Sequence, residues 1–129
     1  MIRGLGIDVA DVVRIRRQVG GRKAGARAER FLARCFTPAE RAYCDARRDR
    51  ATHYAARFAA KEAAMKALGA PAGLRFTEIE VTRGTGAPGL ALRGAAARAA
   101  EALGVSRVHL SLTHDAGVAV AAVILEVER

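Results

Sequence analysis

The chain has 129 residues and a mass of 13.6 kDa, and 22 Lys and Arg against 13 Asp and Glu give it a formal net charge of +9. This length is typical of one domain, residues 1–129, and is sufficient to bury a hydrophobic core. Hydrophobic residues make up 51% of the chain and aromatic residues 5%. This composition excludes a disordered or fibrous chain and leaves a basic, alanine-rich globular domain.

The first half of the chain is predicted to hold one strand and several helices. Residues 2–9 alternate as a strand and lead into a helix that begins near Asp11. Residues 20–27 combine glycines with like charges, which is typical of a mobile basic loop. A short helix is expected over 28–35. A second begins at Thr37-Pro38-Ala39-Glu40, a capping box with proline in the first turn, and runs to about residue 47.

The second half is predicted to be richer in strands. A long helix covers about 51–68 and stops at Gly69, and strands follow at 75–83 and 90–92 around a turn at 84–89. A helix over 94–103 precedes strands at 107–113 and 118–127, which a hairpin turn at 114–117 joins. The order predicts an α+β fold with a mostly antiparallel sheet packed with helices.

The location of the protein is predicted from what the sequence lacks. It contains no run of about eighteen apolar residues, the length that a membrane span requires. The first eight residues meet an acid early and lack the apolar core of a signal peptide. Cys35 and Cys44 are too few for a disulfide framework and are expected in the core. We therefore expect a cytoplasmic protein.

The positive charge indicates an acidic partner but does not identify it. A non-catalytic nucleic-acid-binding module is the default alternative for a small basic domain. Such modules commonly carry aromatic stacking platforms or zinc-finger and helix-turn-helix motifs. The four Phe and two Tyr do not cluster in this way, so charge alone supports this alternative.

Glu62 is the first candidate for chemistry. On a helical projection it lies about 40° from Phe58, at the edge of the apolar arc, and Lys66 follows one turn later. Burial of a carboxylate costs several kcal/mol unless it is paired or binds a cation. Glu62 either pairs with Lys66, reaches water from the rim of the core, or ligates a metal beside a phosphate-directed lysine.

Two further residues have both structural and chemical interpretations. Asp8 either caps the following helix or offers a carboxylate at a strand end, where Mg²⁺ ligands are found. His114 at the hairpin is either a surface residue or, beside Asp115, a phosphate-binding or proton-transfer group. Gly4-Leu5-Gly6 lacks the third glycine of a dinucleotide fingerprint, and Cys35, Cys44 and His53 lack zinc-site spacing.

Four motifs occur together in order: Gly6-Ile7-Asp8-Val9, Phe36-Thr37-Pro38-Ala39-Glu40, Arg57-Phe58-Ala59-Ala60-Lys61-Glu62-Ala63 and Ser111-Leu112-Thr113-His114. With this combination the chain closely resembles the holo-acyl-carrier-protein synthase family of 4′-phosphopantetheinyl transferases over essentially its whole length. The resemblance implies transfer of the phosphopantetheine arm of coenzyme A to a serine of an apo acyl carrier protein. The by-product is adenosine 3′,5′-bisphosphate, and the pathway served is fatty acid or polyketide biosynthesis.

The resemblance also implies roles for individual residues. Asp8 and Glu62 would hold Mg²⁺, and Lys66 would stabilise the leaving phosphate. The coenzyme A contacts expected from the family are Arg57, Lys61, Gly86, Pro88, His114 and Asp115, with His114 also a catalytic candidate. Family members are typically trimers with interfacial sites, so His114 is expected to reach the nucleotide of a neighbouring subunit.

The helix after Asp8 is implied to dock the acidic carrier protein through Arg14, Arg16 and Arg17. Plain solvation is the structural alternative for each of these arginines. A related enzyme that uses Mg²⁺ and a nucleotide with a different acceptor is a third option. We assign Thr37 and Glu40 no chemistry, since the capping box explains them.

Overall fold

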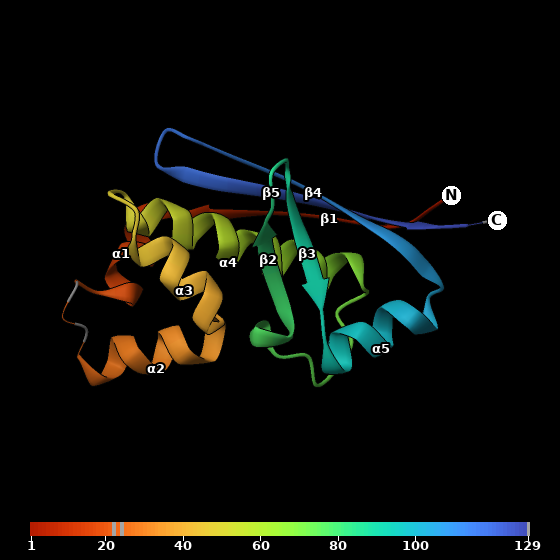
Figure 1. Ribbon diagram of the computed structural model, residues 1–129, viewed down its shortest axis with the longest axis horizontal. Coiled ribbons are helices and arrows are strands. Elements are labelled where there is room, and N and C mark those ends of the chain that lie inside the picture. Colours follow the sequence, from red (N-terminus) through yellow and green to blue (C-terminus); the bar gives the residue numbers. More distant parts are fainter. Residues whose placement is uncertain (22, 24, 129) are drawn as a thin grey trace.

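The computed structural model describes residues 1–21, 23 and 25–128 (Figure 1). In chain order the elements are β1 (Ile2–Asp11), α1 (Val12–Val19), α2 (Ala26–Cys35), α3 (Pro38–Asp45), α4 (Arg50–Ala67), the 3₁₀ turn η1 (Phe76–Glu78), β2 (Ile79–Arg83), β3 (Pro88–Leu92), α5 (Gly94–Ala102), β4 (Val105–Asp115) and β5 (Val118–Val127).

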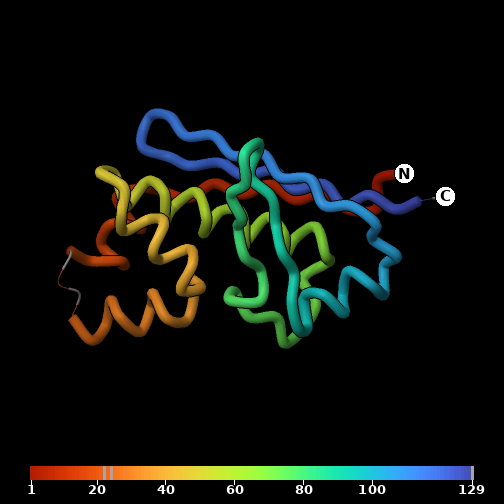
Figure 2. The backbone as a smooth tube through the Cα atoms, viewed as in Figure 1, coloured from red at the N-terminus to blue at the C-terminus, as the bar shows by residue number. Residues whose placement is uncertain are grey.

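Every strand pair of the described chain is antiparallel, which confirms the predicted α+β class. The larger sheet has the order β1-β5-β4, and β2 and β3 form a separate hairpin. Figure 1 shows α4 running beneath the larger sheet, with α1, α2 and α3 at one end and α5 at the other. Both termini lie together at the α5 end (Figure 2), where the Met1 ammonium donates to the Val127 carbonyl at 2.7 Å.

The strand β1 lies directly on the backbone of α4 because two of its inward residues are glycines. A Cβ placed on Gly6 would overlap the Ala63 carbonyl oxygen and would lie 2.9 Å from the Ala67 nitrogen. A Cβ on Gly4 would likewise overlap the Ala67 carbonyl oxygen. The facing residues of α4 are small and buried, so strand and helix approach with little side-chain volume between them.

The opposite face of β1 is apolar and open to solvent. Leu5, Ile7 and Val9, which the sequence places on one face, are 65%, 59% and 58% exposed. They point away from α4, since Gly4 and Gly6 on the alternate positions contact the helix. Large apolar residues that share one exposed face indicate a surface that another molecule covers.

A buried ion pair joins the other side of α4 to α3 and β2. The Lys61 ammonium lies 2.7 Å from Glu40 Oε1, and neither side chain is exposed. Lys61 also donates to the carbonyls of Phe76, at 2.9 Å, and Ile79. The second carboxylate oxygen of Glu40 accepts from the Val81 amide at 2.9 Å. Each buried charge therefore has several partners, which burial requires.

The capping box at Thr37 and Glu40 is confirmed, but Glu40 does more than cap the helix because it also neutralises Lys61. The strand predicted over 75–83 is wrong for its first part. Residues 76–78 form η1, in which a Glu78 oxygen accepts from the Arg75 amide at 2.9 Å.

The predicted loop at 20–27 falls partly on residues 22 and 24, which lie outside the described residues, while Ala26 and Arg27 belong to α2. None of the helices that the structure describes has the length and hydropathy to cross a membrane.

Replacement of Lys61 by Met should lower the free energy of unfolding by about 3–5 kcal/mol, because the Glu40 carboxylate would remain buried without its cation. Urea denaturation measures this change. The control is Glu29→Ala, which breaks the solvated Glu29–Arg41 pair and should cost less than about 1 kcal/mol. Equal effects of the two substitutions would contradict the structural role of the buried pair.

Candidate active site

Asp8 lies on the face of β1 that meets α4. Its side chain is 17% exposed, and its Oδ1 accepts from the Lys66 ammonium at 3.0 Å. The same ammonium donates to the Ile7 carbonyl at 3.0 Å. The interpretation of Asp8 as a helix cap is wrong, because Asp11 caps α1 by accepting from the Val13 amide at 2.9 Å. The carboxylate of Asp8 therefore does not cap α1 and instead binds Lys66.

Glu62 projects from α4 into the same region and is half-buried. Burial raises the pKa of its carboxyl above the ordinary value, and the Asp8 carboxylate raises that pKa further. Lys66 opposes both effects, but the described structure shows no Glu62–Lys66 ion pair, since Lys66 binds Asp8. Two carboxylates thus line one cavity with one lysine bound to Asp8, an arrangement that additional positive charge would stabilise.

A cavity of about 310 Å³ opens beside these carboxylates. One part of its wall is polar and contains Asp8, Glu62 and Arg14, whereas another part contains the rings of Phe31 and Phe58. The two rings stack with centroids 6.1 Å apart. The cavity can therefore hold a ligand that has both charged and apolar parts.

The carboxylate pair fits Mg²⁺ better than a structural metal. Among the described residues there is no cluster of three or more His, Cys, Asp and Glu that could hold a metal by itself. Mg²⁺ commonly takes one or two carboxylates and fills its remaining positions with water and substrate phosphates. Burial, and after it the Asp8 carboxylate, raises the pKa of Glu62, and a divalent cation bound between the two carboxylates would offset both effects.

Lys61 does not belong to this site, and its predicted contact with coenzyme A phosphates is wrong. Its side chain is fully buried on the other side of α4 and is held by Glu40 and two carbonyls. Burial lowers the pKa of the Lys61 ammonium and the Glu40 carboxylate opposes that shift. An ammonium with these partners has no donor left for a phosphate.

Arg57 lies in a separate cluster of positive charge around Tyr43. The guanidinium carbons of Arg47, Arg57 and Arg83 lie 3.9, 4.1 and 5.8 Å from the centre of the Tyr43 ring. A hydrogen bond from Arg47 lowers the pKa of the Tyr43 hydroxyl. Arg57 is only 2% exposed, and its buried Nε has no hydrogen-bond partner. An anion bound here would offset this charge.

The remaining predicted contacts lie outside the carboxylate cavity. His114 and Asp115 are exposed and line another cavity, of about 440 Å³, together with Arg16, Asp49 and Thr52. Gly86 and Pro88 lie at the turn of the β2–β3 hairpin. Within this single chain none of these residues lines the cavity of Asp8 and Glu62.

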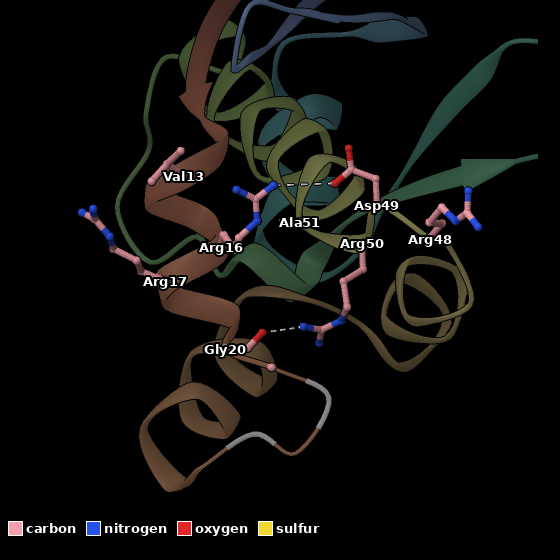
Figure 3. Close-up of a pocket in the computed structure, with 9 residues that line it drawn as sticks. Val13, Arg16, Arg17, Gly20, Arg48, Asp49, Arg50 and Ala51 are labelled. Carbon is pink, nitrogen blue, oxygen red and sulfur yellow. Dashed lines mark hydrogen bonds and ion pairs between the residues drawn. The ribbon is translucent and has the colours of Figure 1, made fainter.

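Arg16 and Arg17 of α1 border a basic hollow between that helix and the start of α4 (Figure 3). Arg16 lies 3.9 Å from the Asp49 carboxylate, while the Arg50 guanidinium donates to the Gly20 carbonyl at 2.7 Å. Arg17 and Arg48 also line this hollow and are exposed. Arg14, one turn before Gln18, instead faces the carboxylate cavity.

The sequence did not predict that Phe31 and Phe58 line the carboxylate cavity, nor that arginines surround Tyr43. Phe58 precedes Glu62 by one helical turn, a spacing that could have indicated a shared cavity. Nothing in the local sequence pointed to Phe31, because α2 reaches the cavity only through its packing beside α1 and Phe58.

Comparison with known proteins identifies the family. The sequence profile of the 4′-phosphopantetheinyl transferase superfamily matches residues 4–123. The chain belongs to this superfamily. This member is 71% identical to the holo-[acyl-carrier-protein] synthase of Anaeromyxobacter dehalogenans, over 98% of this chain and 97% of the relative. It is 54% identical to that of Myxococcus xanthus, over 97% and 95%.

Solved structures agree with this assignment. The synthase of Neisseria meningitidis has a TM-score of 0.80 at 33% identity, covering 98% of this chain and 99% of that one. The synthase of Helicobacter pylori, solved in complex with coenzyme A, has a TM-score of 0.78 at 30% identity and covers 95% and 99%. The fold of this superfamily member is therefore that of the holo-[acyl-carrier-protein] synthases.

Without metal, Glu62→Gln should stabilise the fold at pH 7. Because the folded-state pKa of Glu62 is raised, the folded chain holds this proton more tightly than the unfolded chain, and ionisation above the ordinary glutamate pKa destabilises the native state. Thermal unfolding from pH 4 to 7 should show an advantage of the variant that grows with pH. Exposed Glu101→Gln is the control and should show no such trend. An advantage independent of pH would contradict the electrostatic explanation.

Proposed function

We propose that residues 1–129 form one transferase domain that acts as a Mg²⁺-dependent holo-acyl-carrier-protein synthase. The enzyme transfers the 4′-phosphopantetheine arm of coenzyme A to a serine hydroxyl of an apo acyl carrier protein. A P–O bond of the diphosphate breaks as the serine oxygen, having lost its proton to a base, bonds to phosphorus, and adenosine 3′,5′-bisphosphate leaves. The observation that carries this proposal is that Asp8 and Glu62 line one cavity, with Lys66 bound to Asp8, in a chain of this family.

Each site residue has a role that follows from its position. Asp8 and Glu62 would hold Mg²⁺, which when bound neutralises negative charge on the diphosphate. Lys66 is half-exposed on a flexible side chain, so its ammonium can turn from Asp8 to a phosphate oxygen. There it stabilises the charge that develops as the bond to phosphorus breaks.

Coenzyme A has two further groups of candidate contacts. Arg57 belongs to the cluster of guanidinium groups around Tyr43, whose combined positive charge is suited to a phosphate of the nucleotide. Gly86, Pro88, His114 and Asp115 lie outside the carboxylate cavity of the same chain. They fit the proposal as contacts that a neighbouring subunit contributes, with His114 reaching the nucleotide from that subunit.

We propose that the active enzyme is a homotrimer in which the open face of the larger sheet is covered by copies of the same chain. The support is the row of exposed apolar residues on β1, together with the position of β1 and β4 as sheet edges. Such an assembly would bring the β4–β5 hairpin of one subunit toward the cavity of another, which explains why one chain separates His114 from Glu62.

The acidic carrier protein would dock on α1 through Arg14, Arg16 and Arg17. Arg14 borders the carboxylate cavity, so a partner bound along α1 would bring its serine near Asp8. The net charge of +9 would accelerate association with an acidic partner. We place the reaction in the cytoplasm and in fatty acid or polyketide biosynthesis; the free, buried Cys35 and Cys44 agree with a reducing compartment.

The alternative of a nucleic-acid-binding module is not supported. The aromatic rings that could stack on bases pack against each other instead, as in the pairs Phe31–Phe58 and Phe36–Tyr54. The family assignment likewise gives this alternative no support.

The transfer reaction is tested by incubating an apo acyl carrier protein with coenzyme A, Mg²⁺ and the enzyme, and weighing the carrier by mass spectrometry. We expect a gain equal to the phosphopantetheine arm, which chelation of the metal abolishes. Lys66→Ala should lower kcat about 100-fold or more, as loss of a donor to a developing anion does elsewhere. Glu62→Gln should abolish metal-dependent transfer, and Glu101→Gln should retain it. No gain on any carrier of a panel would refute the proposal.

The assembly is tested by placing a charge on the open sheet face. Ile7→Lys should convert the trimer to monomers and abolish transfer, because a buried ammonium without a partner is costly. Ala102→Lys adds the same charge at an exposed position of α5 and should leave the mass unchanged. Sedimentation equilibrium measures the mass, and a trimer that survives the Ile7 substitution would contradict this interface.

A further inference from the structure

The contact of Gly6 with α4 lies beside both proposed metal ligands. Asp8 follows Gly6 by two residues and so shares its face of β1. On α4, Glu62 directly precedes Ala63, whose carbonyl oxygen a Gly6 side chain would overlap. The carbonyl carbon of Ala63 and the nitrogen of Ala67 would lie 2.8 and 2.9 Å from that added Cβ. These are backbone atoms, which cannot rotate aside.

The spacing between strand and helix therefore sets the spacing between the two carboxylates. The side chains of Asp8 and Glu62 are short, so the positions of β1 and α4 determine how far apart the two carboxylates lie. Lys66 also ties the Ile7 carbonyl and the Asp8 carboxylate to α4. A methyl group at position 6 must push β1 away from α4 near Asp8. Asp8 would move with the strand, whereas Glu62 would stay with the helix.

Resting on the proposed function, we infer that Gly6 is a positioning residue for the cation site. Its missing side chain holds Asp8 and Glu62 at the separation that suits a small divalent cation. Mg²⁺ binds oxygen at about 2.0–2.1 Å in strict octahedral geometry, whereas Ca²⁺ accepts about 2.3–2.6 Å in flexible geometry. A wider gap thus weakens Mg²⁺ binding more than Ca²⁺ binding.

Gly4 provides a matched control on the same strand. A Cβ at Gly4 would overlap the Ala67 carbonyl oxygen and lie 3.2 Å from Leu125 Cδ1. Substitution of Gly4 disturbs the same contact between β1 and α4. The disturbance lies two residues further from Asp8 along the strand, at Ala67 of the helix rather than at Ala63 next to Glu62. A general loosening of the fold would affect the Gly4 and Gly6 variants alike, whereas a positioning role distinguishes them.

The test is calorimetric titration of the coenzyme A complex with Mg²⁺ and, separately, with Ca²⁺. For Gly6→Ala we expect the Kd for Mg²⁺ to rise about tenfold or more, because the spacing of the ligands limits Mg²⁺ binding. The Kd for Ca²⁺ should rise less, so that the Kd for Ca²⁺ divided by the Kd for Mg²⁺ falls at least about fivefold. For Gly4→Ala the unfolding midpoint should fall, but the ratio should stay within about twofold. Equal ratios in the two variants would overturn the inference.

Asp8→Glu keeps the charge and tests the same spacing if Gly6→Ala does not fold. With Gly6 in place, the longer glutamate side chain at position 8 should weaken Mg²⁺ binding about tenfold or more without a change in the unfolding midpoint. Where Gly6→Ala does fold, the same change in that background should recover binding. Wild-type affinity of Asp8→Glu for Mg²⁺ would overturn the inference. If the wild-type enzyme itself bound no Mg²⁺ and transferred no arm, the proposed function would fail instead.

Discussion

The contact of β1 with the backbone of α4 is the constraint on which the rest of the structure depends. Because Gly4 and Gly6 carry no side chains, the strand lies against the helix at Ala63 and Ala67. This approach brings Asp8 to the region of Glu62 and directs the alternate residues of β1 to the outer face. One local feature thus accounts for the candidate cation site and for the open apolar surface that we assign to subunit contact.

Neighbouring charges on α4 have opposite functions because they face different surroundings. Lys61 points into the core, where Glu40 and two carbonyls satisfy it. Glu62 lines a cavity together with Asp8, and burial and the Asp8 carboxylate both raise the pKa of its carboxyl. The first charge fixes α4 against α3 and β2. The second is held at a cost to stability, a pattern typical of functional sites.

The sequence allowed prediction of the element order, the antiparallel class and the edge position of Glu62, since these follow from local periodicity and capping. It did not show that Lys61 is buried, because a helical projection centred on Phe58 assumes one buried face, whereas α4 is covered on both sides. It also left the cap of α1 open between Asp8 and Asp11. Only the path of β1 over α4 shows that Asp11 caps the helix and that Asp8 lines one cavity with Glu62.

The central claim is that Asp8 and Glu62 together bind the catalytic cation. A crystal structure of the enzyme with coenzyme A and Mg²⁺ tests it most directly. Our account predicts one ion ligated by a carboxylate oxygen of each residue and by a diphosphate oxygen, with the Lys66 ammonium turned from Asp8 toward phosphate. An ion bound elsewhere, with Glu62 unliganded while coenzyme A is in place, would contradict the account.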